Sequence, residues 1–461
     1  MPTPPSRRSS LTRRDFFRVS GAGAVAATAA AGSASTLNAQ APAGSGAASA
    51  ADAVGVGFIG VGIRGEILMR TTMAIQGARI VAAADAYDGH FDRIKELAGP
   101  SVSTGRDYRR VLDNPDVQAV VIAVPDHWHV PMALDAMAAG KDVYIEKPMT
   151  HRWEEGASLI AAASTKKRIL QVGSQWDSMP ANAQAIEIIK SGKLGKITLI
   201  DGRIHRNTPT GAWYYPVPPD ASPETIDWDR FIGKATKVPF DAARFFQWRL
   251  YWDYSGGLPT DLFVHLITGT HTVMGVNDMP ARVIGSGGIF NYPKREVPDQ
   301  MTAIVEYPNQ FTLTLTSTAN NGHNFPPLLI MGTEGSLEYY GTRLVYHSEP
   351  ILENYTYSTN HFSKAAKAKF AELHDLDPEN MRPRATSSMK RPEPQEIQTP
   401  GTESTQRHLE KFLECVRTRT EPTENAAAGH RYATVGHMVN VSYRAQKPAT
   451  WNASKQVVEL T

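Results

Sequence analysis

The chain has 461 residues, a formal net charge of +2 and one cysteine, Cys415. This length allows two domains of ordinary size, and a lone cysteine excludes an intrachain disulfide. The charge falls to −2 without the first 41 residues, which hold five arginines and one aspartate. The remainder has no basic stripe for nucleic acid and no apolar stretch long enough for a stable membrane span.

The N-terminal region has the pattern of an export signal. Paired arginines, Arg13 and Arg14, lie in a basic stretch, and residues 19–31 are almost entirely small and apolar. This order is typical of a twin-arginine signal, which we predict over residues 1–41. Residues 42–53 are predicted to be a flexible leader. We therefore expect the twin-arginine export machinery as a partner and a periplasmic or otherwise exported location.

A glycine motif follows the first apolar run, residues 54–59. The sequence GVGIRG is G-x-G-x-x-G directly after a predicted strand. Its first glycine allows a tight turn, the second lets a pyrophosphate approach the backbone, and the third lets the helix pack on the strand. The predicted dinucleotide contacts here are Gly60, Gly62, Ile63, Arg64 and Gly65.

The next predicted strand, residues 80–84, ends at Asp85, which stands 20 positions after Gly65. An acidic residue at about this separation binds the adenosine ribose in dinucleotide-binding folds. Its carboxylate would repel a 2′-phosphate, so the sequence favours NAD over NADP. The alternative is that Asp85 is an ordinary loop residue.

Strands and helices alternate as far as residue 175. Such alternation predicts a doubly wound parallel sheet, a Rossmann domain over residues 54–175. The further strands are predicted at 119–124, 143–145 and 169–172, and the helices at 66–74, 91–97, 108–112 and 131–139.

Two groups of polar residues follow strands of this sheet, where ligands of parallel sheets bind. Pro125 and His129 come after the run 119–124, and Glu146 and Lys147 come after the run 143–145. We predict all four at the nicotinamide end of the crevice, with Pro148 in a cis peptide that aims the lysine. The alternative for Glu146 and Lys147 is a surface ion pair.

Residues 176–461 are predicted to form a second α/β domain. Its long strands are grouped together, which indicates one large, open and mostly antiparallel sheet. One face would carry helices and the other would pair with a second copy, so we expect a homo-oligomer, a dimer or tetramer. The predicted strands are 196–205, 281–290, 300–307, 311–317, 328–332 and 335–340, and the helices are 181–191, 262–274, 408–417 and 432–444. Residues 357–400 read as a surface excursion with a helix at 363–373.

Asp261 and His265 are four residues apart on a predicted helix, which places them on one face. A carboxylate, an imidazole and the ammonium of Lys147 can together orient a hydroxyl and take its proton. These three are the predicted catalytic residues. The alternatives are a helix cap for Asp261 and a packed side chain for His265.

Aromatic residues provide a candidate sugar platform, since aromatic rings pack on pyranose faces. Equally, such residues fill cores and interfaces. The predicted substrate contacts are His205, Arg206, Trp213, Tyr214 and Trp252, together with Asp261 and His265; Tyr215, Trp248, Tyr251 and Tyr254 belong to the same aromatic region. A zinc site from His127, His129 and His265 matches no compact zinc signature, so no metal is predicted.

The order of these motifs resembles the Gfo/Idh/MocA family. The likeness rests on G-x-G-x-x-G, Pro125-Asp126-x-x-His129, the Glu146–Pro148 triplet and Gly256-Gly257-x-x-x-Asp261-x-x-x-His265. The resemblance implies a Rossmann domain, a C-terminal α/β domain and a lysine–aspartate–histidine set acting on polyols and sugars. Many members have asparagine where this chain has Asp126, and an acidic residue is often found near Gly269.

The expected function is an NAD(P)-dependent oxidoreductase acting on the hydroxyl or keto group of a sugar or sugar derivative, with tightly bound NAD. One alternative is an NAD-dependent glycosidase or lyase that oxidises a sugar carbon transiently, eliminates the aglycone and reduces the sugar again. Another is a non-catalytic dinucleotide- or sugar-binding protein. The presence of three chemically matched groups favours an enzyme.

Overall fold

The computed structural model describes residues 53–308, 311–349, 354–383 and 392–461. The predicted export signal over 1–41, and the predicted leader apart from residue 53, lie outside the described residues. None of the described helices is long and apolar enough to cross a membrane.

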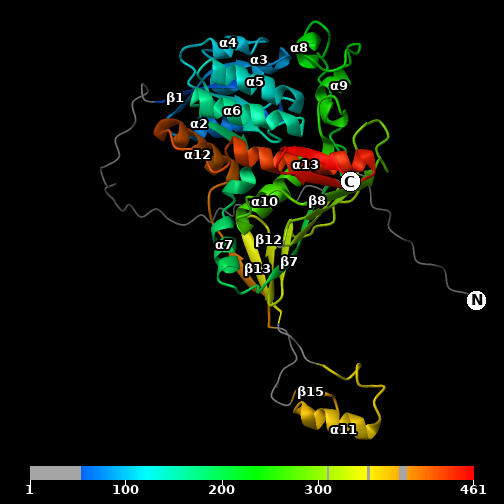
Figure 1. The fold of residues 1–461 in the computed structure, drawn as a ribbon. Helices are drawn as coiled ribbons and strands as arrows, with labels where there is room; N and C mark the ends of the chain where they lie inside the picture. The colour runs from blue at the N-terminus through cyan, green and yellow to red at the C-terminus, as the bar shows by residue number, and fades with distance from the viewer. Residues whose placement is uncertain (1–52, 309–310, 350–353, 384–391) are drawn as a thin grey trace, which may run out of the picture. The chain divides into compact units, whose positions relative to one another are not determined.

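The first domain is built on a six-stranded parallel sheet in the order β3-β2-β1-β4-β5-β6. Figure 1 labels β1 within this domain. Its strands are β1 (Val54–Ile59), β2 (Ala78–Ala84), β3 (Ser103–Gly105), β4 (Ala119–Ile122), β5 (Asp142–Glu146) and β6 (Leu170–Gly173). Strands β1, β4, β5 and β6 are buried along their whole length, as strands covered by helices on both faces must be. The strand order reverses between β1 and β4, and a crevice forms at such a point. The predicted doubly wound sheet is confirmed.

The helices of this domain connect the parallel strands. They are α2 (Ile63–Ala74), α3 (Gly89–Ala98), α4 (Arg109–Leu112), α5 (Asp126–Ala138) and α6 (Gly156–Lys166). The start predicted for α5 is wrong, because the helix begins at Asp126 and contains Pro131 in its second turn. Proline favours the first turn of a helix, but here the preceding turn buries His129 and Val130, and this packing extends the helix back to the strand.

The helix α12 (Ser404–Thr418) crosses the division predicted at residue 175. Its apolar side chains, including Leu409 and Phe412, share a buried cluster with Val56 and Phe58 of β1. Apolar residues at helical spacing form one stripe, and this stripe covers the first sheet. The C-terminal part of the chain therefore completes the core of the N-terminal domain.

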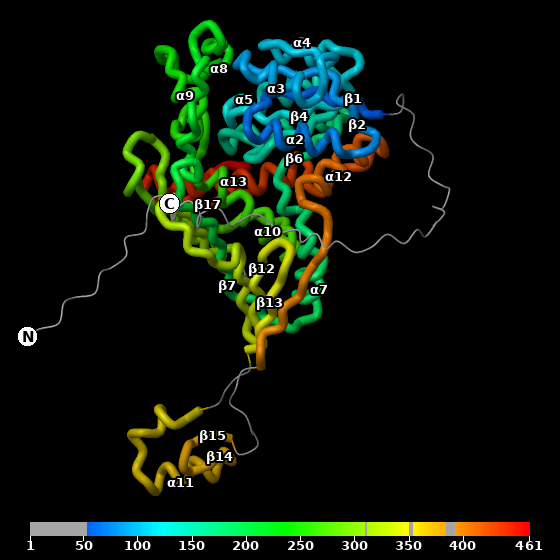
Figure 2. Tube along the Cα trace, turned by 180° about the vertical axis from the view of Figure 1, so that it is seen from behind, coloured from blue at the N-terminus to red at the C-terminus, as the bar shows by residue number. Residues whose placement is uncertain are grey.

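The second domain has a ten-stranded sheet in which β7 and β10 form the one parallel pair among the described strands. The predicted large, mostly antiparallel sheet is confirmed. In spatial order its strands are β16 (Gln395–Gln398), β13 (Arg343–Ser348), β12 (Gly335–Tyr339), β11 (Leu328–Gly332), β7 (Ile197–His205), β10 (Thr312–Thr318), β9 (Gln300–Glu306), β8 (Arg282–Gly288), β17 (Ala449–Asn452) and β18 (Val457–Leu460). Figure 2 shows β7, β12 and β13 from behind, together with α7 (Asn182–Lys190) and α10 (Val264–Met274).

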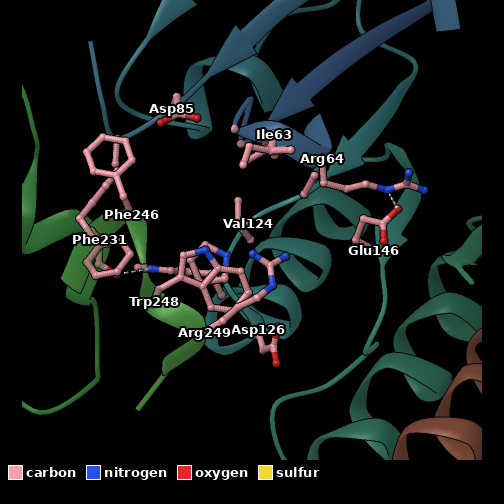
Figure 3. A pocket seen from close by; sticks show the side chains of 18 of the residues that line it. Ile63, Arg64, Asp85, Val124, Asp126, Glu146, Phe231, Phe246, Trp248 and Arg249 are labelled. Carbon is pink, nitrogen blue, oxygen red and sulfur yellow. Dashed lines mark hydrogen bonds and ion pairs between the residues drawn. The ribbon is translucent and has the colours of Figure 1, made fainter. Parts of the chain in front are cut away.

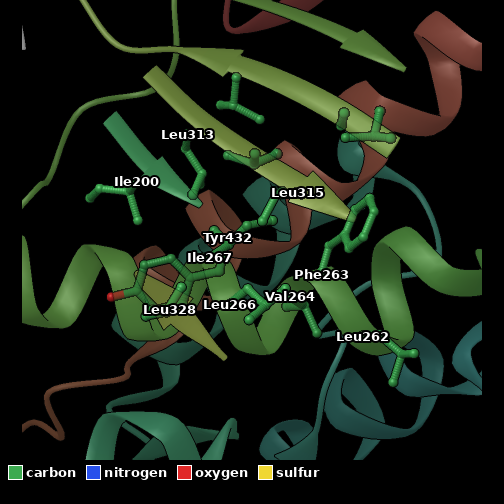
Figure 4. Packing of buried hydrophobic residues seen from close by; sticks show 14 of the residues in the cluster. Ile200, Leu262, Phe263, Val264, Leu266, Ile267, Leu313, Leu315, Leu328 and Tyr432 are labelled. Atoms are coloured by element: carbon green, nitrogen blue, oxygen red, sulfur yellow. The ribbon is translucent and has the colours of Figure 1, made fainter. Parts of the chain in front are cut away.

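One face of this sheet packs on helices. Along β10 the buried Leu313 and Leu315 alternate with partly exposed threonines. Figure 4 shows these leucines and Ile200 of β7 packed near Leu266 of α10. The long helix α13 (Ala426–Ala445) packs against β8 and α10. Burial of α10 on the sheet fixes His265 in its first turn, and Asp261 lies in the π-helical turn Pro259–Phe263 directly before it.

The excursion predicted at 357–400 includes a small unit of its own within the described residues. Helix α11 (Lys364–Leu373) is capped by Ser363, whose Oγ accepts a hydrogen bond from the Ala366 N–H. It is followed by the short pair β14 (Leu376–Asp377) and β15 (Arg382–Pro383). The helix predicted at 363–373 is confirmed.

Candidate active site

A cleft of about 540 Å³ is lined by both domains. The glycine loop and the carboxyl ends of β2, β4 and β5 contribute from the first domain, and Arg206, Trp213, Arg249 and the start of α10 contribute from the second. Figure 3 shows Asp85, Ile63 and Arg64 on one side of this cleft, with Trp248 and Arg249 on the other. The structure therefore brings the predicted cofactor loop and the predicted catalytic residues to one place.

The three motif glycines have distinct surroundings. Gly60 has φ +83°, which favours glycine, and a Cβ on Gly65 would lie 2.2 Å from the Gly60 carbonyl oxygen. A Cβ on Gly62 would meet only His90 Cε1, at 3.8 Å. The first and third glycines thus serve the turn and the helix packing, and the second leaves open space beside the backbone. This arrangement fits a dinucleotide pyrophosphate.

Asp85 lies at the end of β2 and faces the same loop. Its Oδ2 accepts a hydrogen bond from the Val61 N–H at 2.7 Å and lies 3.0 Å from His90 Nδ1. Burial raises the pKa of the Asp85 carboxyl, but His90 and the backbone hydrogen bonds outweigh it and keep the pKa below its ordinary value. The ionised carboxylate fits the ribose hydroxyls of NAD.

Glu146 and Lys147 do not pair with each other through their side chains. The Glu146 carboxylate accepts a hydrogen bond from Arg64 Nε at 2.8 Å and one from Gln175 Nε2 at 3.1 Å. Arg64 therefore lines the cleft with its guanidinium tied to Glu146 (Figure 3). The alternative of a surface ion pair between Glu146 and Lys147 is wrong, because Glu146 is buried and Lys147 points to the second domain.

Lys147 binds Asp261 across the two domains. The Nζ donates to Asp261 Oδ1 at 2.9 Å and to the Asp261 backbone oxygen at 2.8 Å. Arg249 Nε also donates to Oδ1, at 3.3 Å. Burial raises the pKa of Asp261, but the charges of Lys147 and Arg249 lower it by more, so the net pKa is well below its ordinary value. The Lys147–Pro148 peptide is cis, as predicted.

His265 follows Asp261 by one turn and lines the same cleft. Its Nδ1 is buried and has no hydrogen-bond partner among the described residues. Burial lowers its pKa well below the ordinary value, and the ammonium of Lys147 lowers it further. The imidazole is therefore neutral and able to accept a proton.

Asp126 is a fourth ionisable group here, and the sequence prediction gave it no role. The side chain is only 4 % exposed, and its Oδ2 accepts a hydrogen bond from the Gly256 N–H at 3.3 Å. Burial raises the pKa of Asp126 to about 7, against the opposing effect of Arg249. Its position directly after Pro125 at a strand end is the sequence signal that could have indicated such a role.

We expect Asp126→Asn to stabilise the protein at pH 8 more than at pH 5. The unfolded carboxyl loses its proton near pH 3.8 and the folded one near pH 7, so the stability of the natural protein falls as the pH rises between these values. Asparagine does not titrate. The free energy of unfolding at pH 8 should therefore be higher in the variant by up to about 4 kcal/mol, at about 1.4 kcal/mol per pKa unit. Thermal unfolding at both pH values checks this, with the exposed Asp116→Asn as control. Equal midpoints for the variant and the natural protein at pH 8 would contradict it.

Several residues predicted for the site lie elsewhere. The ring nitrogens of His129 face the carbonyl oxygens of Pro148 and Val124, and the imidazole is fully buried. His205 borders a smaller hollow and packs on Phe325. Tyr214 stacks on Tyr292, and the Trp252 ring lies beneath Arg444. Of the predicted cofactor and substrate contacts, those that line the cleft are Gly60, Gly62, Ile63, Arg64, Asp85, Pro125, Glu146, Lys147, Arg206, Trp213, Asp261 and His265.

Tyr215 and Trp248 of the aromatic region also line the cleft, as do the nearby Phe231, Phe245 and Phe246. Arg249, which stacks on the Trp248 ring with its Cζ at 4.1 Å from the centroid, is the residue that sequence reasoning missed most clearly. Its neighbours in the sequence are aromatic, but nothing in the sequence shows that it meets Asp261.

The three histidines of the discarded zinc alternative do not form a ligand cluster. Among the described residues, Asp177, His408 and Glu424 form the one group of three potential ligands within 4.8 Å of one another, and none of them lines the cleft. Both ring nitrogens of His408 already contact oxygens, those of Val172 and Ser178.

A doubly wound sheet with this glycine loop, joined to an α/β domain that adds a lysine–aspartate–histidine group to the same cleft, is an arrangement suited to hold a dinucleotide beside groups that can move a proton. Family models agree over most of the chain. Residues 54–174 match the Gfo/Idh/MocA oxidoreductase family's NAD-binding Rossmann fold, and residues 186–450 match the family's C-terminal alpha/beta domain. The chain belongs to the Gfo/Idh/MocA family, and NAD is its cofactor.

Curated relatives match part of the chain. An alpha-N-acetylgalactosaminidase of Shewanella oneidensis is 28 % identical over 148 residues, which are 30 % of this chain and 32 % of the relative. Inositol 2-dehydrogenase 1 of Saccharopolyspora erythraea is 30 % identical over 173 residues, or 37 % of this chain and 51 % of the relative. The matched stretches thus span a third to a half of these relatives.

Solved structures match the whole fold. A levoglucosan dehydrogenase in complex with NADH and levoglucosan has a TM-score of 0.62 at 17 % identity, covering 88 % of this chain and 99 % of that one. An aldose-aldose oxidoreductase of Caulobacter crescentus, complexed with glycerol, has a TM-score of 0.61 at 18 % identity, covering 86 % and 99 %. At such low sequence identities, the structural similarity establishes that the fold is shared.

Proposed function

We propose that the protein is an NAD-dependent oxidoreductase acting on the hydroxyl or keto group of a sugar or sugar derivative. The observation that carries the proposal is the ion pair of Lys147 and Asp261 beside the neutral His265, in the cleft that also holds the glycine loop. Sugar and inositol oxidoreductases among the similar proteins support the substrate class.

The geometry assigns a role to each group. Bound NAD supplies a hydride acceptor. Two of the three Lys147 ammonium protons are donated to Asp261, which leaves one for the substrate oxygen. His265 is neutral and accepts the hydroxyl proton as the carbonyl forms. Asp261 stays ionised and holds the ammonium in place.

A glycosidase outcome is the second candidate, and Asp126 favours it. Elimination of an aglycone from an oxidised sugar needs one group to remove the proton beside the carbonyl and another to protonate the leaving group. His265 can accept a proton, and Asp126, with a pKa raised to about 7, can donate one. The alpha-N-acetylgalactosaminidase relative supports the same possibility. Strongly shifted pKa values in one cleft favour either enzyme over a non-catalytic binding protein.

A panel of free sugars and nitrophenyl glycosides tests both candidates. One portion of the purified protein is denatured, and the NAD that it releases is identified by mass; the folded remainder is used for the panel. A dehydrogenase gives net absorbance of reduced nicotinamide with a free sugar. A glycosidase gives nitrophenol with no net change in the redox state of the cofactor. Neither signal across the panel, with NAD bound, would contradict the proposed activity.

We also propose that the chain is exported by the twin-arginine pathway and forms a homo-oligomer. Arg13, Arg14 and the small apolar run after them support export, which moves folded proteins with their cofactors. The threonine-rich outer face of β10 and the 40 % exposed Ile304 of β9 lie on the sheet face opposite the helices and support pairing with a second copy.

A further inference from the structure

Among the residues that the structure describes, the cleft has one cationic side chain that makes no ion pair with a carboxylate. Its lysine and arginines are Arg64, Arg106, Lys147, Arg206, Arg230 and Arg249. All except Arg206 make an ion pair with a carboxylate: Arg64 with Glu146, Arg106 with Asp88, Lys147 and Arg249 with Asp261, and Arg230 with Asp227. Arg206 makes none with any residue that the structure describes.

The backbone of Arg206 is held at the end of β7, and its side chain lines the cleft. It follows β7 directly, and its backbone N–H donates to the Thr318 oxygen at 2.8 Å. Arg206 lines the same cleft as Asp261 and His265, and its positive charge contributes to lowering the pKa of both. The cofactor's pyrophosphate has its own donors at the start of α2, so Arg206 is free for the other ligand.

The carboxylates near Arg206 do not balance the positive charge at this end of the cleft. Asp261 is shared between Lys147 and Arg249. Asp126 is buried and holds its proton up to a pH of about 7. Two cationic groups therefore compete for one ionised carboxylate, and Arg206 adds a third positive charge in contact with the cleft.

We propose that the substrate is a sugar bearing an anionic substituent, a carboxylate or a sulfonate, which the guanidinium of Arg206 binds. The fork of an arginine matches two oxygens of either group through parallel hydrogen bonds. This inference rests on the proposed function, because it names the substrate class of the same site.

Matched ligands on the full-length holoprotein test the inference. Calorimetric titration compares nitrophenyl glucoside with nitrophenyl glucuronide and with the 6-sulfo-6-deoxyglucoside, in both anomers. We expect at least one anionic member to bind about tenfold or more tightly than its neutral partner, with the difference reduced at high salt. The carboxylate and sulfonate arms identify which oxyanion the site prefers.

Variants assign the preference to Arg206. Arg206→Gln should weaken binding of the anionic ligand at least about tenfold more than binding of the neutral one, and Arg206→Lys should keep part of the preference. Arg282→Gln, which removes an exposed pair with Glu306, is the matched control. A neutral ligand that binds as tightly as the anionic ones, equal losses for both in Arg206→Gln, or no binding by any member would overturn the inference.

The two proposals fail in different ways. Turnover of a neutral sugar, unaffected by Arg206→Gln, would overturn the anionic substrate and leave the oxidoreductase standing. Anion binding that depends on Arg206, in a protein that turns over no sugar with NAD bound, would overturn the oxidoreductase and leave the anion-binding role of Arg206 standing.

Discussion

Lys147→Met is expected to lower turnover by about 10²–10⁴-fold, the range that one positioned proton-transfer group contributes. Methionine keeps most of the side-chain volume but removes the proton that faces the substrate oxygen. Asp261 retains Arg249 as a partner, so its carboxylate is not left unpaired. Initial rates with the best sugar of the panel, together with NAD content, measure the effect.

The cofactor should stay bound in this variant, because the glycine loop and Asp85 hold its other end. Lys166→Ala, on the exposed side of α6, is the control and should keep the natural rate. Turnover within about threefold of the natural protein, far below the contribution of such a group, would show that Lys147 has no part in the reaction.

Gly62→Val should abolish cofactor binding while the fold persists. The φ of Gly62 is −69°, which any residue adopts, and its Cβ meets only the edge of His90. The two methyl groups of valine then occupy the space where the backbone faces the pyrophosphate. We expect an affinity for NAD at least about 100-fold weaker, or about 2.7 kcal/mol.

Titration with NAD and the nucleotide content of the purified protein check this expectation. Gly105→Val is the control, since a Cβ there makes ordinary contact with Arg110 alone and does not enter the cleft. A Gly62→Val protein that still carries a full complement of NAD would place the pyrophosphate elsewhere.

The parallel sheet was predictable because its strands are short apolar runs that alternate with helices. The strands 54–59, 119–124, 143–145 and 169–172 were predicted within about two residues of the observed bounds. The elements that were not predicted have physical features in common. Strand β3 has three residues, and the edge strand β18 and its neighbour β17 have four residues each with mixed polarity, so neither length nor periodicity indicated them. The docking of α12 on the first sheet depends on tertiary packing, which periodicity does not specify.

The site was predictable where chemistry follows local sequence. The spacing of Asp261 and His265 and the place of Lys147 after a strand each indicated one cleft. The roles of Arg249 and Asp126 were not predicted, because they come from burial and from neighbours elsewhere in the chain. Trp252 and Tyr214 were misplaced for the opposite reason, since an aromatic sequence does not tell a sugar platform from a packed core.

The central claim is that a nicotinamide ring shares the cleft with Lys147, Asp261 and His265. A crystal structure with NAD bound measures it directly. We expect the reactive carbon of the ring beside an oxygen-sized space that both Lys147 Nζ and His265 reach at about 3 Å, the distance for proton sharing. A ring more than about 8 Å from all three side chains, beyond a hydrogen bond through one water, would contradict it.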